Sequence, residues 1–217
     1  MIKCILFDLD GVLVDATGWH YQSLNLALRD VCGFALTPLE HETTFNGLPT
    51  KEKLRILIRQ GRVRPEHAAR IFEAKQRFTN TVIEQACTAQ PEKVHMMQQL
   101  AASYRLACVT NSIRQTAELM LRKAGYLPHV EFFLSNEDVT RPKPHPDGFI
   151  IAMHKMGVRP EETVVVEDAP KGIAAAKASG CHVLEILGYH DLDLPRVTRF
   201  LATIGSGAGV VTHTEVS

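Results

Sequence analysis

The 217-residue sequence lacks an excess of charge of either sign, because 24 basic and 24 acidic side chains cancel. This balance argues against the basic surface that binding to nucleic acid or to an anionic membrane requires. The sequence also lacks an apolar run of membrane-spanning length, and Asp8 and Asp10 interrupt its first apolar stretch. We therefore expect a soluble cytoplasmic protein without a nucleic-acid or membrane partner.

Paired cysteines and metal-binding histidine patterns are lacking too. The five cysteines are odd in number and form no Cys-x-x-Cys motif, which favours reduced thiols in a cytoplasmic protein. Cys4, Cys108 and Cys181 lie in or beside apolar runs, where cysteine acts as a small hydrophobic residue. The ten histidines show no metal-ligand spacing, so we expect most of them at the surface.

What the sequence does have is a distinctive beginning. An apolar run over residues 2–7 has the length of a buried strand and is followed by Asp8, Asp10 and Gly11. A short Asp-x-Asp and one remote acid are enough to hold Mg²⁺. With the ion shielding its charge, one aspartate can attack phosphorus while the other, protonated, serves the leaving oxygen. The alternative is a strand followed by an ordinary Asp-Gly turn.

Residues 16–83 show helical patterns only. We expect helices over residues 15–33, from residue 37, over 50–61 and over 65–84, and no stretch between Trp19 and Glu84 favours a strand. A simple alternating sheet does not continue with an all-helical insertion after one strand. The sequence therefore predicts that residues 16–83 form a separate small domain.

From residue 84 onward, helix and strand patterns alternate. Strands are expected over residues 105–109, 132–135, 163–166 and 181–187, and helices over 92–103, 113–124, 147–156 and 169–179. Repeated units of this size predict an α/β fold, with a Rossmann-like parallel sheet covered by helices on both faces and right-handed crossovers. Residues 1–15 and 84–217 are assigned to this domain, and the tail could add a last strand around Val210 and Val211.

Polar residues follow directly on three of the expected strands. They are Asp8 and Asp10, Thr110 and Asn111, and Glu167 and Asp168. Because the carboxyl ends of parallel strands share one edge of a sheet, we expect these side chains to converge on one site. Asp168 is the natural third metal ligand, and Glu167 either ligates the metal or lies just behind it. The alternative for this acidic pair is a modest stabilisation of the next helix through its dipole.

Two further segments suit an anionic substrate. Thr110, Asn111 and Ser112 stand before a helix, whose free N–H groups favour a phosphate, although all three residue types also favour a helix N-cap. Lys143 stands between Pro142 and Pro144, which restrict the backbone around it. A fixed ammonium suits a phosphoryl group and the aspartate that attacks it. The alternative is a surface loop with an exposed lysine.

These four pieces, in this order, resemble motifs I to IV of the haloacid dehalogenase (HAD) superfamily over residues 2–187. The resemblance implies the following roles: Asp8 as the nucleophile that forms an aspartyl-phosphate, Asp10 as the general acid and base, Thr110 with Asn111 as the phosphate-binding groups, and Lys143 as the charge-neutralising lysine. It further implies Mg²⁺ held by Asp8, the Asp10 carbonyl and Asp168, with Glu167 close by. An acid at position 10 favours a phosphatase or phosphomutase within the superfamily.

The helical insertion is similar to the small cap that lies between motifs I and II in members that act on small phosphometabolites. The β-phosphoglucomutase-like branch is the most similar, since His20 matches its hinge histidine and residues 46–48 match its cap loop. Thr50 stands where the mutase has a phosphate-binding arginine; Lys51 beside it could substitute, and Lys75 matches a second cap lysine.

The resemblance therefore implies a Mg²⁺-dependent phosphatase that hydrolyses a small phosphometabolite, a sugar phosphate above all. A monomer is the default expectation for a chain of this size. Two alternatives stay open. A sugar phosphomutase would keep its aspartyl-phosphate until an intermediate rebinds. A non-catalytic binding protein could share the fold, but it would be expected to lack a motif residue, and none is lacking here.

Overall fold

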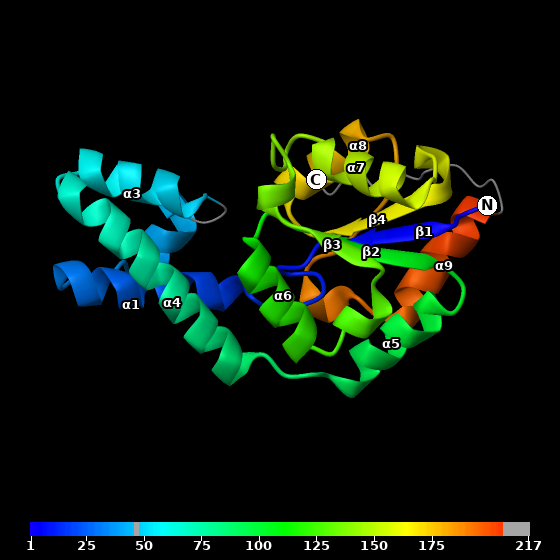
Figure 1. Cartoon of the computed structure of the whole chain (residues 1–217), viewed down its shortest axis with the longest axis horizontal. Helices are drawn as coiled ribbons and strands as arrows, with labels where there is room; N and C mark the ends of the chain where they lie inside the picture. The colour runs from blue at the N-terminus through cyan, green and yellow to red at the C-terminus, as the bar shows by residue number, and fades with distance from the viewer. Residues whose placement is uncertain (46–47, 206–217) are drawn as a thin grey trace, which may run out of the picture. The chain divides into compact units, whose positions relative to one another are not determined.

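The computed structural model describes residues 1–45 and 48–205, and Figure 1 labels its helices and strands. The chain divides into two compact units: an α/β unit, Met1–Asp15 with Thr88–Ser217, and a helical unit, Ala16–Cys87. We expected the second boundary after residue 83. Helix α4 (Ala68–Ala86) continues past that point, so the division falls after the helix ends.

Five parallel strands form the sheet of the α/β unit, in the order β3-β2-β1-β4-β5. Their bounds are Cys4–Phe7 (β1), Arg105–Val109 (β2), Phe132–Leu134 (β3), Thr163–Glu167 (β4) and His182–Glu185 (β5). β1 lies in the middle and is buried along its whole length, as an apolar run in a doubly covered sheet must be. The register aligns Phe7 with Cys108 on one side and with Val166 on the other. The carboxyl ends of β1, β2 and β4 are therefore neighbours.

Helices cover both faces of this sheet (Figure 1). One face carries α5 (Pro91–Ala101), α6 (Arg114–Lys123) and α9 (Leu194–Gly205), and the other carries α7 (Asp147–Met156) and α8 (Pro170–Ala178). Short 3₁₀ turns lie in the connections, at Leu127–His129, Asn136–Asp138, Pro160–Glu162 and Tyr189–Asp191. The predicted α/β fold, a parallel sheet between two helical layers, is confirmed.

Apolar side chains of α7 and α8 pack on the sheet and form much of its core. Phe149 on α7 is fully buried in one cluster with Cys4 and Val165. Burial of a phenylalanine side chain contributes about 2–3 kcal/mol. Cys4, Cys108 and Cys181 are buried free thiols, which confirms the prediction that they act as small hydrophobic residues.

The helical unit is built around two long helices that pack along each other, α1 (Thr17–Cys32) and α4. Its shorter elements are α2 (Pro38–Glu40), a π-helical turn (His41–Phe45), α3 (Thr50–Arg59) and a 3₁₀ turn (Pro65–His67). Leu24, Leu28, Leu57 and Ile71 belong to its apolar core. Over residues 16–45 and 48–87 the structure has no strand, as the sequence predicted.

Some predicted features lie outside the described residues. They are the last strand around Val210 and Val211, and Asn46 and Gly47 of the expected cap loop. In the described ranges, no helix is long and apolar enough to cross a membrane.

Candidate active site

Asp8 is the first residue after β1 and is held in line with the sheet. Its backbone N–H donates to the Val166 carbonyl at 3.0 Å, which continues the pairing between β1 and β4. The chain then turns at Gly11, whose φ of 91° is a conformation that L-residues other than glycine rarely adopt. Gly11 also lies against Asp168, because a Cβ at position 11 would stand 3.0 Å from the Asp168 Cγ. This turn brings the backbone after Asp8 close to the acids that follow β4.

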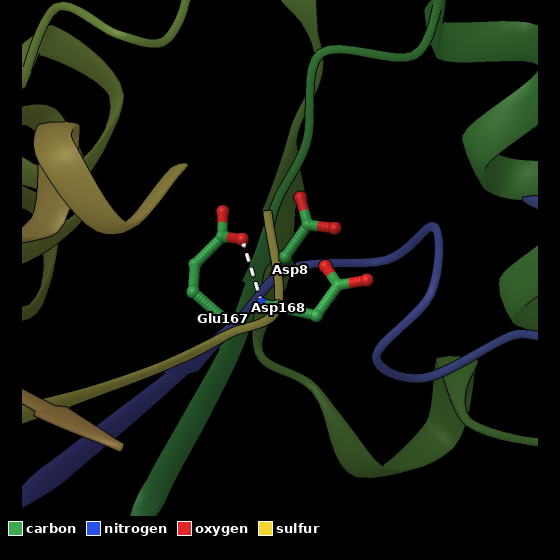
Figure 2. Close-up of side chains that lie close together, drawn as sticks. All are labelled: Asp8, Glu167 and Asp168. Carbon is green, nitrogen blue, oxygen red and sulfur yellow. Dashed lines mark hydrogen bonds between the residues drawn. The ribbon is translucent and has the colours of Figure 1, made fainter. Parts of the chain in front are cut away.

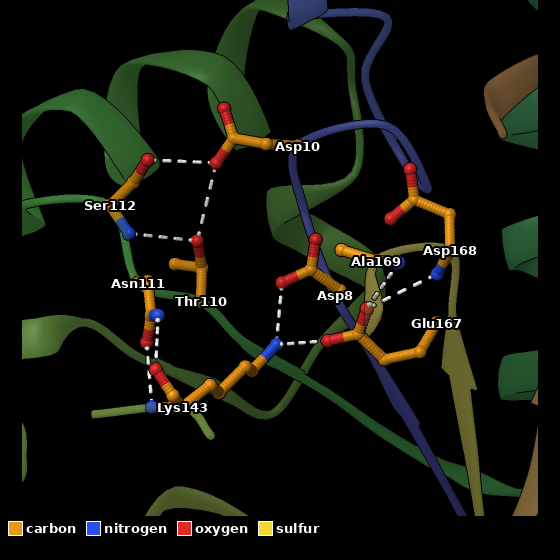
Figure 3. A network of polar contacts seen from close by, with 9 residues as sticks. All are labelled: Asp8, Asp10, Thr110, Asn111, Ser112, Lys143, Glu167, Asp168 and Ala169. Atoms are coloured by element: carbon orange, nitrogen blue, oxygen red, sulfur yellow. Dashed lines mark hydrogen bonds and ion pairs between the residues drawn. The ribbon is translucent and has the colours of Figure 1, made fainter. Parts of the chain in front are cut away.

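Lys143 joins Asp8 to Glu167. Its Nζ donates to Asp8 Oδ1 and to Glu167 Oε1, at 2.6 Å each (Figure 3). All three side chains are buried. A buried charge needs a partner, and this ammonium has two. The alternative, a surface loop with an exposed lysine, is therefore wrong for Lys143.

The backbone of Lys143 is fixed by Asn111. The Asn111 amide donates to the Lys143 carbonyl at 3.1 Å, and its oxygen accepts from the Lys143 N–H at 3.1 Å. One side chain thus supplies the pair of hydrogen bonds that a neighbouring strand would supply. Asn111, which follows β2, thereby places the proline-flanked lysine at the sheet edge.

Asp10 accepts hydrogen bonds from two hydroxyl groups after β2. Ser112 Oγ donates to Asp10 Oδ2 at 2.7 Å, and Thr110 Oγ1 donates to the same oxygen at 3.3 Å (Figure 3). The alternative that these residues cap α6 is not what the structure shows, since the N-cap is Ile113 and makes no side-chain bond. Sequence reasoning assigned no role to Ser112, although it lies in the segment that we singled out.

Asp8, Glu167 and Asp168 form an acidic cluster. One carboxylate oxygen from each lies within 4.8 Å of the others (Figure 2). The Glu167 oxygens are already engaged: Oε1 accepts from Lys143, and Oε2 accepts from the N–H groups of Asp168 and Ala169 at 3.1 and 3.3 Å. Asp168 differs, because its Oδ1 is buried and accepts no hydrogen bond from the described residues.

The electrostatics of the cluster favour an additional cation. Burial raises the pKa of Asp8 well above its usual range; Lys143 opposes this rise and Glu167 adds to it. Burial and the charge of Glu167 raise the pKa of Asp168 to about 6. Burial lowers the pKa of Lys143, but the two carboxylates outweigh it, and the net shift is upward. The ammonium is thus firmly charged, and the carboxylates outnumber it.

These residues fit a magnesium ion. Carboxylate oxygens are the ligands that Mg²⁺ prefers, and the buried Asp168 Oδ1 is an oxygen that requires a partner. The three clustered carboxylates carry more negative charge than the single Lys143 ammonium offsets, and a divalent cation would offset the rest. Asp8 and Asp168 have carboxylate oxygens for it, whereas the Glu167 oxygens are occupied.

The family model of the haloacid dehalogenase-like hydrolases matches residues 5–186 of this chain. The chain belongs to this family. Hexitol phosphatase A of Escherichia coli (strain K12) is 34% identical to this hydrolase over 190 residues, which are 85% of this chain and 82% of that protein. Validoxylamine A 7'-phosphate phosphatase of Streptomyces hygroscopicus subsp. limoneus is 29% identical over 196 residues, 89% of each chain. The predicted membership of the HAD superfamily is confirmed.

The hydrolase also resembles solved structures. It matches the crystal structure of a β-phosphoglucomutase from Clostridium difficile with a TM-score of 0.76 and 20% identity, over 95% of this chain and 99% of that chain. At this identity the likeness shows the fold alone. It agrees with the α/β fold predicted from the strand and helix pattern.

The remaining candidates of this hydrolase lie in the helical unit. His20 is on α1, Thr50 and Lys51 begin α3, and Lys75 is on α4. Lys51 is exposed, with its Nζ 5.8 Å from the centre of the Phe72 ring, whereas Lys75 is buried.

The buried polar residues that sequence reasoning missed in the same unit include His41 and Lys53. A signal existed for Lys53. It stands one turn before Leu57, so the helical spacing places it on the apolar face of α3.

Proposed function

We propose that this hydrolase is a Mg²⁺-dependent phosphatase that cleaves small phosphate monoesters, sugar phosphates above all, through an aspartyl-phosphate on Asp8. The ion pair of Lys143 with Asp8 and Glu167 is the observation that carries the proposal. Lys143 opposes the rise that burial causes in the pKa of Asp8, and so favours the charged carboxylate that a nucleophile requires at the carboxyl end of this central strand. The names of the two phosphatase relatives support the reaction class.

In the first step, a carboxylate oxygen of Asp8 attacks phosphorus and the bond between phosphorus and the ester oxygen breaks. The leaving oxygen needs a proton, and protonated Asp10 donates it. In the second step a water molecule attacks the phosphoryl group on Asp8. Asp10 takes the proton of that water, and Asp8 and inorganic phosphate are released. The products are an alcohol and phosphate, and both aspartates return to their initial states.

Other residues position these groups. Lys143 neutralises the charge that gathers around the phosphoryl group, and Asn111 holds the lysine backbone in place. Thr110 and Ser112 hold the Asp10 carboxylate by its Oδ2. When substrate binds, the Thr110 hydroxyl can donate its hydrogen bond to a phosphoryl oxygen instead of to Asp10. Glu167 keeps Lys143 directed at Asp8.

Asp8, the Asp10 carbonyl and Asp168 are the proposed holders of Mg²⁺, with Glu167 behind them. When bound, the ion supplies positive charge to the phosphoryl oxygens and shields the Asp8 carboxylate from them. The helical unit is the proposed cap, with His20, Thr50, Lys51 and Lys75 as substrate contacts. The alternative, a phosphomutase, is less favoured, because Thr50 stands where that enzyme has a phosphate-binding arginine.

Phosphate release from a panel of sugar phosphates, sugar bisphosphates and nucleotides tests the proposal. We expect release from a subset of the panel with Mg²⁺, and none after Asp8→Asn or in the presence of EDTA. Asp30→Asn is the matched control, because it makes the same change at an exposed position on α1. Release that persists in Asp8→Asn at the rate of Asp30→Asn would show that the nucleophile is not Asp8.

A further inference from the structure

Helix α7 brings an aromatic ring to the ammonium group of Lys143. Phe149 lies in the first turn of α7 and is fully buried. The Nζ of Lys143 lies over the face of its ring, 4.9 Å from the ring centre. An ammonium within about 6 Å of a ring centre is attracted by the negative face of the π-system. In addition to its two carboxylate partners, Lys143 thus contacts an aromatic ring.

Burial distinguishes this contact from the similar ones on the molecule. In the other contacts between a cation and a ring that the described residues show, the cation is exposed or half-exposed. Lys143 has an exposed fraction of 8%, and Phe149 has none of its surface exposed. Water weakens the attraction of a cation to a ring, so a desolvated pair gains more from it than an exposed one. The contact of Lys143 with Phe149 is therefore the one from which a strong effect is expected.

The ring is held in a fixed place under the lysine. A Cβ at position 148 would stand 2.8 Å from Val109 Cγ1, so the first turn of α7 lies directly on β2. The start of this helix is also joined to the loop that carries Lys143. Arg141 donates from Nε and from a terminal nitrogen to the two carboxylate oxygens of Asp147, at 3.0 and 2.8 Å. The loop and the helix therefore keep the ammonium and the ring together.

An uncharged contact of this kind has a use in a two-step reaction. In the proposed mechanism the negative charge beside Lys143 changes its place. Asp8 carries it before the first step, the phosphoryl group carries it between the steps, and Asp8 carries it again at the end. The ring has no net charge and takes no part in bond changes, so its attraction for the ammonium is the same in every state. It can hold Lys143 in place while the charges around it are rearranged.

We propose that Phe149 is a positioning residue of this hydrolase, whose ring face holds the Lys143 ammonium between Asp8 and Glu167 through both steps. Phe149 acts through Lys143 and does not touch the reacting atoms. The inference rests on the proposed phosphatase function, because that function gives Lys143 its place at the phosphoryl group.

Fluorinated phenylalanines test the ring face without changing the shape of the core. Ring fluorines withdraw electrons from the π-face and leave the size of the side chain nearly the same. Mono-, tri- and pentafluorophenylalanine are incorporated at position 149 of the full chain, and phosphate release is measured with Mg²⁺. We expect kcat to fall stepwise with fluorine number, about 10- to 30-fold for the pentafluoro ring, and KM to stay within about twofold.

Phe132 provides the matched control. Its ring centre lies 5.2 Å from the Nζ of Lys155, an exposed lysine, and it belongs to the edge strand β3. The same fluorinated residues at position 132 make the same chemical change outside the site and leave kcat unchanged. If kcat did not fall in the series at position 149, or fell equally in the series at position 132, the proposal would be overturned.

Unfolding in guanidinium tests the contact without catalysis. Fluorination makes a buried ring more apolar, which by itself keeps or raises the unfolding midpoint. Loss of the attraction to Lys143 lowers it. We therefore expect the midpoint to fall stepwise in the series at position 149, but not in the same series combined with Lys143→Met. An equal fall in both would show a packing effect and would overturn the proposal.

Two further outcomes complete the test. If Lys143→Met does not fold, the series at position 132 becomes the comparison, and a midpoint that falls no further at position 149 than at position 132 would overturn the proposal. If the wild type releases phosphate from no ester, while the midpoint falls only when Lys143 is present, the proposed function fails and the contact between the ring and the ammonium stands.

Discussion

Substitution of Gly172 by alanine tests how closely α8 packs on the ion-pair network. A Cβ at this position would stand less than 3.0 Å from the Glu167 carboxylate, which is buried and bonded to Lys143. The helix itself would favour alanine by about 1 kcal/mol. Overpacking costs about 1–3 kcal/mol, and disruption of a buried ion pair about 3–5 kcal/mol. The Cβ meets the ion-paired carboxylate itself, so disruption of the ion pair is the larger cost. After the gain in helix propensity we expect a net loss of about 2–4 kcal/mol in the free energy of unfolding.

Guanidinium unfolding and phosphate release measure the two consequences of this change. Because Glu167 directs Lys143 toward Asp8, kcat falls together with stability. Gly18→Ala is the matched control. Gly18 lies in α1, and no atom stands within 4 Å of the point that a Cβ at position 18 would occupy, so alanine there stabilises by up to about 1 kcal/mol. If the Gly172→Ala variant were as stable and as active as the wild type, the packing argument would be refuted.

Three further predictions concern charge. Lys143→Met leaves Asp8 and Glu167 buried without their cation, so it lowers the free energy of unfolding by about 3–5 kcal/mol in guanidinium titrations and abolishes phosphate release. Mg²⁺ at about 100 times its Kd raises the unfolding free energy by about 2.7 kcal/mol, EDTA reverses this, and Asp168→Asn weakens it. The pKa of Lys53 is about 8 in the folded chain, below its usual value of 10.5, because burial and a neighbouring lysine lower it. Between these two pH values the unfolded chain binds more protons than the folded chain, so the free energy of unfolding rises with pH. Between pH 8 and 10.5, in buffer without phosphate, the wild type gains up to about 3 kcal/mol relative to Lys53→Met; parallel stability curves would contradict this.

The gathering of polar side chains at one edge of the sheet could be predicted, because the pairing of parallel strands fixes where the end of each strand lies. Asp8, Thr110 and Glu167 each end an apolar run, and parallel pairing in register places such ends together whatever the side chains do. Lys143 was predicted from the prolines on both sides of it, which restrict its backbone. The structure shows its ammonium buried at that same edge.

The hydrogen bonds inside the site could not be predicted in the same way. Asn111 was expected to bind phosphate, yet both of its amide atoms bond to the Lys143 backbone, and Ser112 holds Asp10. Such choices depend on loop conformation rather than on periodicity. Lys53 was missed for another reason: lysine is almost never fully buried, so the helical spacing that placed it inward was not applied to it.

The two partners of Lys143 have a consequence for the inactive enzyme. Asp8→Asn removes one of two buried negative charges around one positive charge, and Lys143 keeps Glu167 as its partner. The change therefore brings the network closer to neutrality, and the variant should fold at least as well as the active form. Selection for catalysis would then have kept a carboxylate that folding alone does not need. An inactive chain of this kind is suited to retain an uncleaved substrate from a cell extract, so that mass spectrometry can identify it.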